Sequence, residues 1–349
     1  MHGNFKITGM NLIQRATTRL RERLTARGLV LMYHRIAEPD LDPWGLRVSP
    51  EHFAEHLEVI NKYFQPLSMK DLLSQLQCSK VPNRSIVVTF DDGYVDNLQH
   101  AKPLLERYDV PATIFLVTEA ILDERNFWWD ELQWALLQPG TLPEGLELRT
   151  NERQYEWQLG DARRYSQQDR QKDGRRRPWD ARPGTRLAFF YLIWQRLLEL
   201  SKPERLEALD MIRAWAGVNE DLRFGDRALS PDEVNILGEG GLIELGAHTM
   251  THPSLNVLSI SQQQEEISGS KLQLENIIRR PVKSFSYPHG DYSVETIELV
   301  QRAGFQGAST TNFRCVTPGA DPFQLPRFQI DDWSGAEFLR RLARWYALS

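Results

Sequence analysis

The strongest constraint on the fold is a strand–helix–strand pattern in the first third of the chain. Residues 86–90 (IVVTF) form a continuous apolar, β-branched run that breaks at Asp91-Asp92-Gly93, which predicts a buried strand ending in a turn. A helical pattern follows at about 97–108, and residues 110–117 predict the next strand. This spacing is typical of a βαβ unit and therefore predicts an α/β fold with a parallel sheet or barrel.

The rest of the chain continues this pattern around one long interruption. Further strands are predicted at 28–33, 242–247, 284–286 and 307–310, and helices at about 261–279 and 293–303. The interruption, residues 119–228, contains an Arg-rich segment and helical patterns at 187–200 and 203–216. We therefore divide the chain into an N-terminal amphipathic helix (1–27), a first α/β part (28–118), a largely helical insertion (119–228) and a second α/β part (229–349).

Charge and cysteine content exclude several classes of protein. The 349 residues carry 42 Lys and Arg against 47 Asp and Glu, so a net charge of −5 gives no support for nucleic-acid binding. Two cysteines, Cys78 and Cys315, make a disulfide framework or a four-Cys zinc site improbable. Arg175-Arg176-Arg177 is typical of a solvated loop, with a polyanion site as the alternative.

The ends of the chain and its apolar runs predict a cytoplasmic protein. The first thirty residues contain no apolar signal-peptide core, and no apolar run approaches the roughly 18 residues of a membrane-spanning helix. Residues 10–27 have the pattern of a basic amphipathic helix, which either packs on the protein or makes peripheral contact with an anionic membrane. The oligomeric state is not predictable from these features.

Two histidine pairs have the i, i+4 spacing, so spacing alone does not identify a metal site. His52 and His56 fall on a predicted helix and are interpreted as surface or packing residues. His248 directly follows a predicted strand, and the carboxyl ends of parallel strands are where sites assemble in α/β folds. Pro253 disfavours helical geometry at His252, so we expect a turn that brings the imidazoles of His248 and His252 together.

Asp91 and Asp92 offer the further ligand that two imidazoles need. Burying an unpaired carboxylate is costly, and adjacent carboxylates raise each other's pKa. One solution gives one carboxylate to a metal and leaves the other as a base; the alternative is a turn that caps the following helix. Two His and one carboxylate with open positions suit Zn²⁺, and the same ligands also suit Co²⁺, Fe²⁺ or Mn²⁺.

Together these motifs resemble those of the polysaccharide deacetylase family, the NodB-homology domains of carbohydrate esterase family 4. Residues 89–94 (TFDDGY) are similar to the first family motif and residues 248–252 (HTMTH) to the second. The resemblance covers roughly 28–118 and 229–332 and leaves the insertion unexplained. It implies an irregular, incomplete (β/α) barrel with the site at the carboxyl ends of the strands.

The resemblance also implies roles for individual residues. Asp92, His248 and His252 would bind the metal, and Asp91 would be the general base that deprotonates water for attack on an acetyl carbonyl. Residues 285–290 (FSYPHG) resemble a third motif whose backbone amide faces the oxyanion; since Pro288 has no N–H, the donor would be the amide of His289.

In two places the chain departs from the common family pattern. The third motif lacks its initial Arg, so the contact to the base carboxylate is assigned to Arg327. No His follows His289, so the general acid is assigned to His34, with a hydrogen-bonded strand-end His as the alternative. Residues 331–333 (DDW) resemble a weaker fourth motif that lines the site.

The predicted function is a metal-dependent hydrolase that removes N-acetyl groups from amino sugars in a polysaccharide or lipid-linked glycan. Trp128 and Trp129 offer stacking surfaces for sugar rings or pack within the insertion. An O-acetyl esterase or small-amide hydrolase with the same site is a second interpretation. A carbohydrate-binding protein on a degenerate scaffold is a third.

Overall fold

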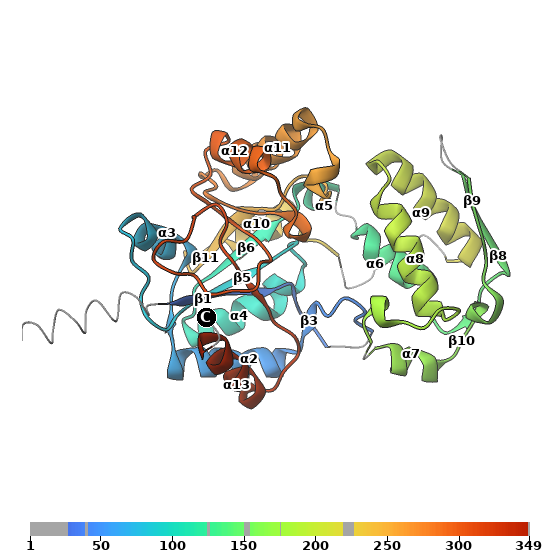
Figure 1. Ribbon diagram of the computed structural model, residues 1–349, viewed down its shortest axis with the longest axis horizontal. Coiled ribbons are helices and arrows are strands. Elements are labelled where there is room, and N and C mark those ends of the chain that lie inside the picture. The colour runs from blue at the N-terminus through green and yellow to red at the C-terminus, as the bar shows by residue number, and fades with distance from the viewer. Residues whose placement is uncertain are drawn as a thin grey trace, which may run out of the picture.

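A parallel sheet of eight strands forms the main body of the protein (Figure 1). The computed structural model describes residues 27–38, 41–123, 126–149, 154–174, 176–218 and 227–347. The strands follow the order β13-β12-β11-β6-β5-β1-β14, with β4 also paired to β5. They comprise β1 (Gly28–Tyr33), β4 (Gln65–Pro66), β5 (Ser85–Phe90), β6 (Ala112–Leu116), β11 (Ile243–Ala247), β12 (Ser284–Ser286), β13 (Gly307–Ser309) and β14 (Phe328–Gln329).

Helices surround this sheet. They are α2 (Pro50–Tyr63), α3 (Met69–Gln77), α4 (Lys102–Tyr108), α5 (Thr118–Asp123), α10 (Pro231–Leu237), α11 (Ile260–Ile278), α12 (Val294–Arg302) and α13 (Gly335–Ala347). Ser49 caps α2 by accepting a hydrogen bond from the amide of His52, and Pro50 is the first residue of the helix, where proline is favoured. A π-helical turn at Asn97–Ala101 precedes α4, so the helix predicted at 97–108 is present with an irregular start.

Both faces of the sheet are buried, which explains the uninterrupted apolar runs. In β1, Leu29 and Leu31 belong to the cluster beneath the outer helices, whereas Val30 faces a smaller inner cluster. The inner cluster joins Val87 and Phe115 to apolar side chains of α3. Because neither face meets water, the strands need no polar alternation.

An irregular segment at 322–329 completes the barrel between its two edges. The amide of Ala308 in β13 donates to the carbonyl of Pro322, and the amide of Leu325 donates back to Ala308. A few residues later, β14 pairs with β1. The sheet is thus a curved, irregular parallel barrel, and the predicted α/β class is confirmed.

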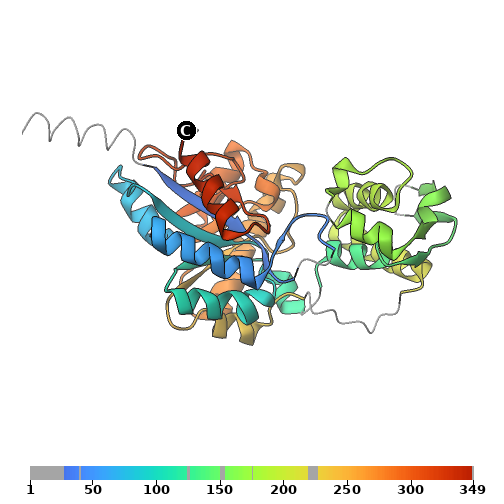
Figure 2. The same ribbon diagram turned by 90° about the horizontal axis from the view of Figure 1, so that it is seen from below.

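The second body of the molecule is formed by the chain between α5 and α10 (Figures 1 and 2). It contains α6 (Trp128–Leu136), α7 (Gln167–Asp173), α8 (Arg186–Leu198), α9 (Lys202–Ala216), a 3₁₀ turn at Pro178–Asp180, β7 (Gly140–Thr141), β8 (Gly145–Arg149), β9 (Gln154–Gln158) and β10 (Arg164–Tyr165). The antiparallel pair β8–β9 was not predicted from the sequence. These elements share their own apolar cluster.

At the boundary between the two bodies, residues of one body pack against the other. Trp44, from the loop that joins β2 (Arg35–Ile36) to β3 (Arg47–Val48), packs against Phe190 and Trp194 of α8, with ring centroids 5.6 and 4.7 Å apart. Helix α5 packs on α11, and its Ile121 belongs to the apolar cluster beneath the outer helices of the barrel. We therefore propose that the inserted unit begins after α5, a few residues beyond position 119.

The basic helix predicted at 10–27 lies, apart from Arg27, outside the described residues. Among the residues that the structure describes, no helix has the length and apolar character to cross a membrane.

Candidate active site

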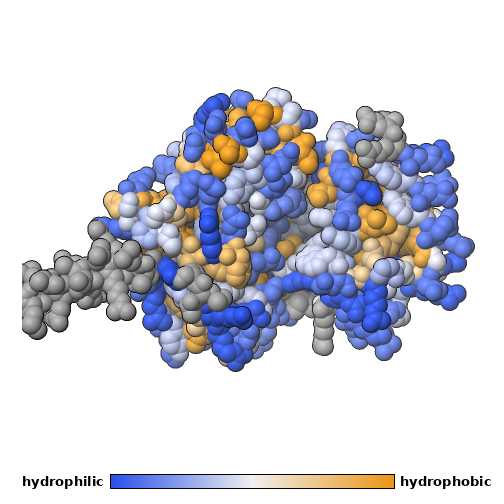
Figure 3. Space-filling model, viewed as in Figure 1, coloured by the Kyte–Doolittle hydropathy of each residue, from blue (hydrophilic) through white to orange (hydrophobic). Residues whose placement is uncertain are grey.

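A pocket of about 510 Å³ opens at the carboxyl ends of the barrel strands and is walled by the inserted unit. Figure 3 shows the surface hollowed between the two bodies. Residues from the barrel lie at its floor, and Trp129, Trp179 and Trp194 of the inserted unit lie at its wall. All seven residues that the sequence analysis singled out as site residues are among those lining it: His34, Asp91, Asp92, His248, His252, His289 and Arg327.

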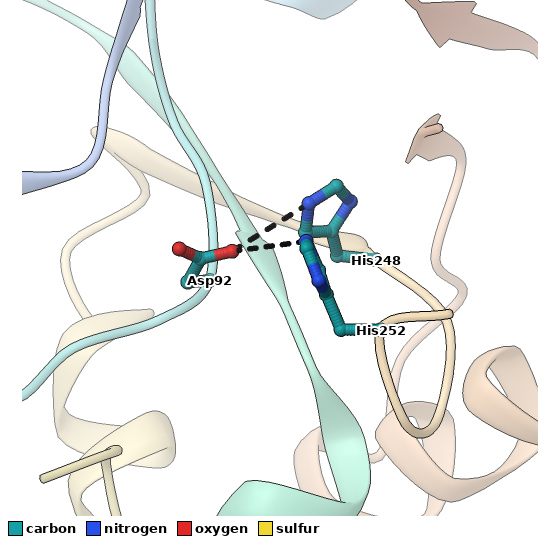
Figure 4. Close-up of side chains that lie close together, drawn as sticks. All are labelled: Asp92, His248 and His252. Carbon is teal, nitrogen blue, oxygen red and sulfur yellow. Dashed lines mark ion pairs between the residues drawn. The ribbon is translucent and has the colours of Figure 1, made fainter. Parts of the chain in front are cut away.

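Asp92, His248 and His252 converge on one point (Figure 4). Oδ1 of Asp92 lies 3.6 Å from Nε2 of His248 and 3.5 Å from Nε2 of His252. Two ligand atoms that each lie about 2.1 Å from one tetrahedral ion are about 3.4 Å apart. The spacing in the structure therefore fits a shared divalent cation.

The hydrogen bonds of these three residues also fit a cation. Nδ1 of His248 lies 2.8 Å from the carbonyl oxygen of Ser286, so that nitrogen carries the proton and Nε2 keeps its lone pair toward Asp92. Oδ1 of Asp92 is buried and has no hydrogen-bond partner among the described residues. Burial and the nearby charges of Asp91 and Asp130 raise the pKa of Asp92, so this carboxylate needs a positive partner to stay ionised.

Unusual backbone conformations aim these side chains. Asp92, Thr249, His252 and His289 all have positive φ, at 76°, 65°, 57° and 58°, which non-glycine residues rarely adopt. Gly93 continues the turn after Asp92 with φ 87°, and a Cβ there would lie 2.5 Å from Cδ2 of Leu116. Three of these residues, Asp92, His252 and His289, line the pocket, and Thr249 directly follows the lining residue His248, so the strained backbone gathers at the pocket.

A buried glutamate supports the loop between the two histidines. Glu266 of α11 accepts hydrogen bonds from the amides of Met250 and Thr251 at 2.8 and 3.0 Å and from the Thr251 hydroxyl at 2.6 Å. The sequence analysis missed this residue, because it stands in a run of polar residues with no signal of its own. Its contacts hold His252 in place through the backbone.

Arg327 clamps Asp91 with both of its terminal nitrogens. Nη1 donates to Oδ1 of Asp91 and Nη2 to Oδ2, each at 2.7 Å. Nη2 also donates to the hydroxyl of Ser286 at 2.8 Å, and Nε donates to the carbonyl of Thr310 at 2.9 Å. Burial alone would raise the pKa of Asp91, but the charge of Arg327 outweighs it and holds the pKa well below its ordinary value. Asp91 is therefore ionised at neutral pH.

His34 and His289 line the same pocket as this cluster. His34 follows β1, and burial lowers its pKa to about 4 although the charge of Asp91 opposes the shift. His289 lies with its ring centroid 4.6 Å from that of His252, and burial lowers its pKa to about 4 as well. Both imidazoles are neutral at pH 7 before any reaction.

Trp129 was expected either to stack on sugar rings or to pack within the insertion, and its position allows both. Its indole N–H donates to the Tyr94 hydroxyl at 2.8 Å, and its ring lies 5.0 Å from that of His252. It is therefore a packed residue that also faces the pocket. Trp128, by contrast, lies beneath the guanidinium of Arg205, 4.9 Å from the ring centroid, and does not line this pocket.

The fourth motif does not line the site, which corrects that expectation. Asp331 forms an ion pair with Arg177 of the inserted unit at 2.7 Å, and Asp332 accepts hydrogen bonds from Ser49 and contacts His52. These carboxylates are taken up by α2 and the inserted unit, so they are not available to the pocket. Arg177 is consequently a partly exposed bridge between the two bodies.

The histidines of α2 lie away from the cluster, in agreement with their interpretation as packing and surface residues. Nε2 of His56 lies 2.7 Å from the Trp333 carbonyl oxygen, and its ring stacks on Phe338 of α13 at 4.0 Å. Nδ1 of His52 lies 2.7 Å from Asp332. This pair fastens the C-terminal helix to α2.

Fold and site together define an α/β barrel with a candidate metal site at its strand ends, and comparison with known proteins gives its family. The family model for polysaccharide deacetylases matches residues 79–142 and 194–308, just over half of the chain. The protein belongs to this family, as the motifs predicted. It is a hydrolase of the polysaccharide deacetylase type, which acts on carbon–nitrogen bonds.

Individual relatives are distant in sequence. YxkH of Bacillus subtilis, named as a polysaccharide deacetylase, is 21% identical over 88% of this chain and 74% of its own length. The poly-β-1,6-N-acetyl-D-glucosamine N-deacetylase of Staphylococcus epidermidis is 28% identical over 27% of this chain and 37% of its own length.

Solved structures share the fold. The deacetylase PplD of Streptococcus pyogenes, determined with acetate, superposes with a TM-score of 0.56 at 18% identity, over 90% of this chain and 98% of that one. IcaB of Ammonifex degensii superposes with a TM-score of 0.54 at 16% identity, over 92% of this chain and 97% of that one. The predicted deacetylase barrel is thereby confirmed.

Proposed function

We propose that the protein is a divalent-metal-dependent deacetylase that releases acetate from N-acetylated amino sugars of a polysaccharide or lipid-linked glycan. One observation carries this proposal: three buried ligand side chains meet beside a carboxylate that Arg327 keeps ionised. The staphylococcal relative is named as a poly-β-1,6-N-acetyl-D-glucosamine N-deacetylase, which supports the substrate class. Asp92, His248 and His252 are the proposed metal ligands.

In the proposed reaction the metal ion and the residues of the protein have separate roles. A divalent cation held by these ligands supplies Lewis-acid polarisation of the acetyl carbonyl and acidification of water. Asp91 accepts the proton of the attacking water, and Arg327 orients both carboxylate oxygens for that task. The amide of His289 donates a hydrogen bond to the developing oxyanion.

His34 is the proposed acid for the departing amine. Because burial keeps this imidazole neutral at rest, it must first receive a proton, and Asp91 is the neighbouring group that has just taken one. A proton transferred to His34 is then available to the amine nitrogen as the carbon–nitrogen bond breaks. The two residues thus act as base and acid of one turnover.

Zinc is the proposed metal. Two imidazole nitrogens and one carboxylate oxygen with a remaining open position are the donor set of catalytic Zn²⁺ sites. Co²⁺, Fe²⁺ and Mn²⁺ accept the same donors, so elemental analysis of the purified protein decides between them.

The decisive experiment is acetate release from N-acetylglucosamine oligomers, measured alongside O-acetylated sugars and simple amides. The proposal expects release from the amino-sugar oligomers by the metal-loaded enzyme and little release by Asp91→Asn with equal metal content. Preference for O-acetyl esters or simple amides would replace the substrate assignment. Glycan binding by wild type and Asp91→Asn without acetate from either would identify a binding protein.

A further inference from the structure

The aromatic wall of the pocket belongs to no motif of the deacetylase site. Four of the ten tryptophans of the chain line this pocket: Trp44, Trp129, Trp179 and Trp194. Three of them come from the inserted unit and Trp44 from the loop packed against it. A further aromatic residue, Phe313, lies on the barrel side. The inserted unit therefore shapes the substrate pocket.

Trp179 differs from the other three because it is exposed. It is 55% accessible, whereas Trp129 is 6% accessible, and Phe313 on the barrel side is 61% accessible. A single exposed aromatic side chain needs no explanation, but two such residues at the mouth of one pocket form an apolar rim. Flat aromatic faces bury large apolar areas while leaving hydroxyl groups beside them hydrated.

The segment that carries Trp179 is held in place from the barrel. Nη2 of Arg177 forms its ion pair with Asp331 at 2.7 Å, and its guanidinium lies directly against Gly45, where a Cβ would come within 1.6 Å of Nη1. Pro178 is buried and begins the 3₁₀ turn in which Trp179 stands. The exposed indole is thus mounted on a fixed turn.

The charge of the lining residues limits which chemical class of ligand this rim can bind. Apart from the site residues already described, the lining residues are neutral: Met32, Trp44, Leu46, Trp129, Trp179, Trp194, Thr311, Phe313 and Gln329. Among these described residues there is no cation for a phosphate or carboxylate of the ligand. Thr311 and Gln329 offer hydroxyl and amide groups instead. An uncharged saccharide, apolar on its ring face and polar at its edge, matches this surface.

We propose that Trp179 forms a subsite for the sugar residue adjacent to the one that is deacetylated, and that Arg177 positions it through Asp331. This inference rests on the proposed function. It makes the enzyme selective for saccharide chains over single acetylated sugars, since only a chain reaches both the metal ligands and the rim.

The test compares chain lengths. Acetate release is measured for N-acetylglucosamine and its neutral di-, tri- and tetrasaccharides with wild type, Trp179→Ala and Trp179→Phe. We expect kcat/KM of the wild type to rise with chain length, and Trp179→Ala to lower the tetramer-to-monomer ratio of kcat/KM about tenfold, mainly through KM. Trp179→Phe should recover most of that ratio. An unchanged ratio in Trp179→Ala would overturn the subsite.

Arg177→Ala tests the positioning role against a matched neighbour. It should reproduce the KM effect of Trp179→Ala, whereas Arg176→Ala, whose partner is Asp173 on the inserted unit, should behave as wild type. Thermal midpoints of both variants show whether the fold is kept. If Arg177→Ala keeps the wild-type chain-length ratio, Arg177 has no positioning role.

The two proposals fail in different ways. If the metal-loaded wild type releases acetate from none of these saccharides, the proposed function fails. If it releases acetate with the same kcat/KM from monomer and tetramer, only the subsite fails.

Discussion

The guanidinium of Arg327 grips both carboxylate oxygens of Asp91 at 2.7 Å, although 235 residues separate the two in the chain. Both side chains are buried, so this bidentate pair is protected from solvent screening. The pair gives two adjacent aspartates different surroundings. Asp91 is ionised and its charge is balanced by Arg327, whereas Asp92 has no such partner in the described part of the chain and can bind a cation.

Loss of Arg327 should reduce turnover without removing the metal. Arg327→Ala leaves Asp91 buried without its partner, so we expect kcat to fall roughly 100-fold or more and the free energy of unfolding to drop by about 3–5 kcal/mol. Arg327→Lys keeps the charge but not the two-pronged contact and should fold better while remaining slow. Metal content stays at the wild-type level in both. Arg314→Ala, an exposed arginine nearby, serves as the control. Wild-type turnover in Arg327→Ala would remove it from the mechanism.

Replacement of Asp92 should separate metal binding from stability. Asp92→Asn removes a buried carboxylate with an unpartnered oxygen beside Asp91, so the metal-free protein should unfold at a higher temperature than metal-free wild type. The same variant should lose bound metal, and added Zn²⁺ should stabilise wild type but not the variant. Elemental analysis and calorimetry measure these effects. His52→Gln, from the other histidine pair, should retain its metal; retention by Asp92→Asn would refute the ligand assignment.

The role of His34 depends on the leaving group. An amine must be protonated as it departs, whereas a nitrophenolate leaves without a proton. We therefore expect His34→Asn to slow acetate release from an N-acetylated sugar roughly 100-fold and to affect hydrolysis of nitrophenyl acetate much less. Equal losses on both substrates would assign His34 to packing or to binding instead.

Acid should loosen the attachment of α13 through His56. Burial lowers the pKa of this imidazole to about 4, against an ordinary value of about 6.5, so the unfolded chain binds more protons between these pH values. Stability from this group is complete above about pH 6.5 and is lost as the pH falls toward 4, by a few kcal/mol at most. Denaturation of His56→Leu across pH 4 to 7 should show a flatter dependence. His100→Gln, an exposed substitution, should keep the wild-type slope.

Much of the barrel was predictable because its signals are local. The strand at 28–33 has the predicted bounds, since an apolar run that is buried on both faces needs no partner to be recognised. The short strand at 284–286 also has the predicted bounds. The turn between His248 and His252 followed from Pro253 and from the strand before it. The β8–β9 pair was missed although its strands, GLELR and QYEWQ, alternate apolar and polar residues as half-buried strands do.

The sequence by itself predicted the residues of the candidate site: which side chains would bind a metal, which would act as a base, and which strand ends carry them. The contact between Arg327 and Asp91 was expected from the family resemblance, and the structure contains it. Only the tertiary structure decided that Asp331 and Asp332 are occupied elsewhere and that the inserted unit supplies the aromatic wall. The physical reason is the distance along the chain between the residues that interact. Strand ends and turns follow from neighbouring residues, whereas barrel closure at 322–329 and the docking of the inserted unit depend on packing between segments far apart in the chain.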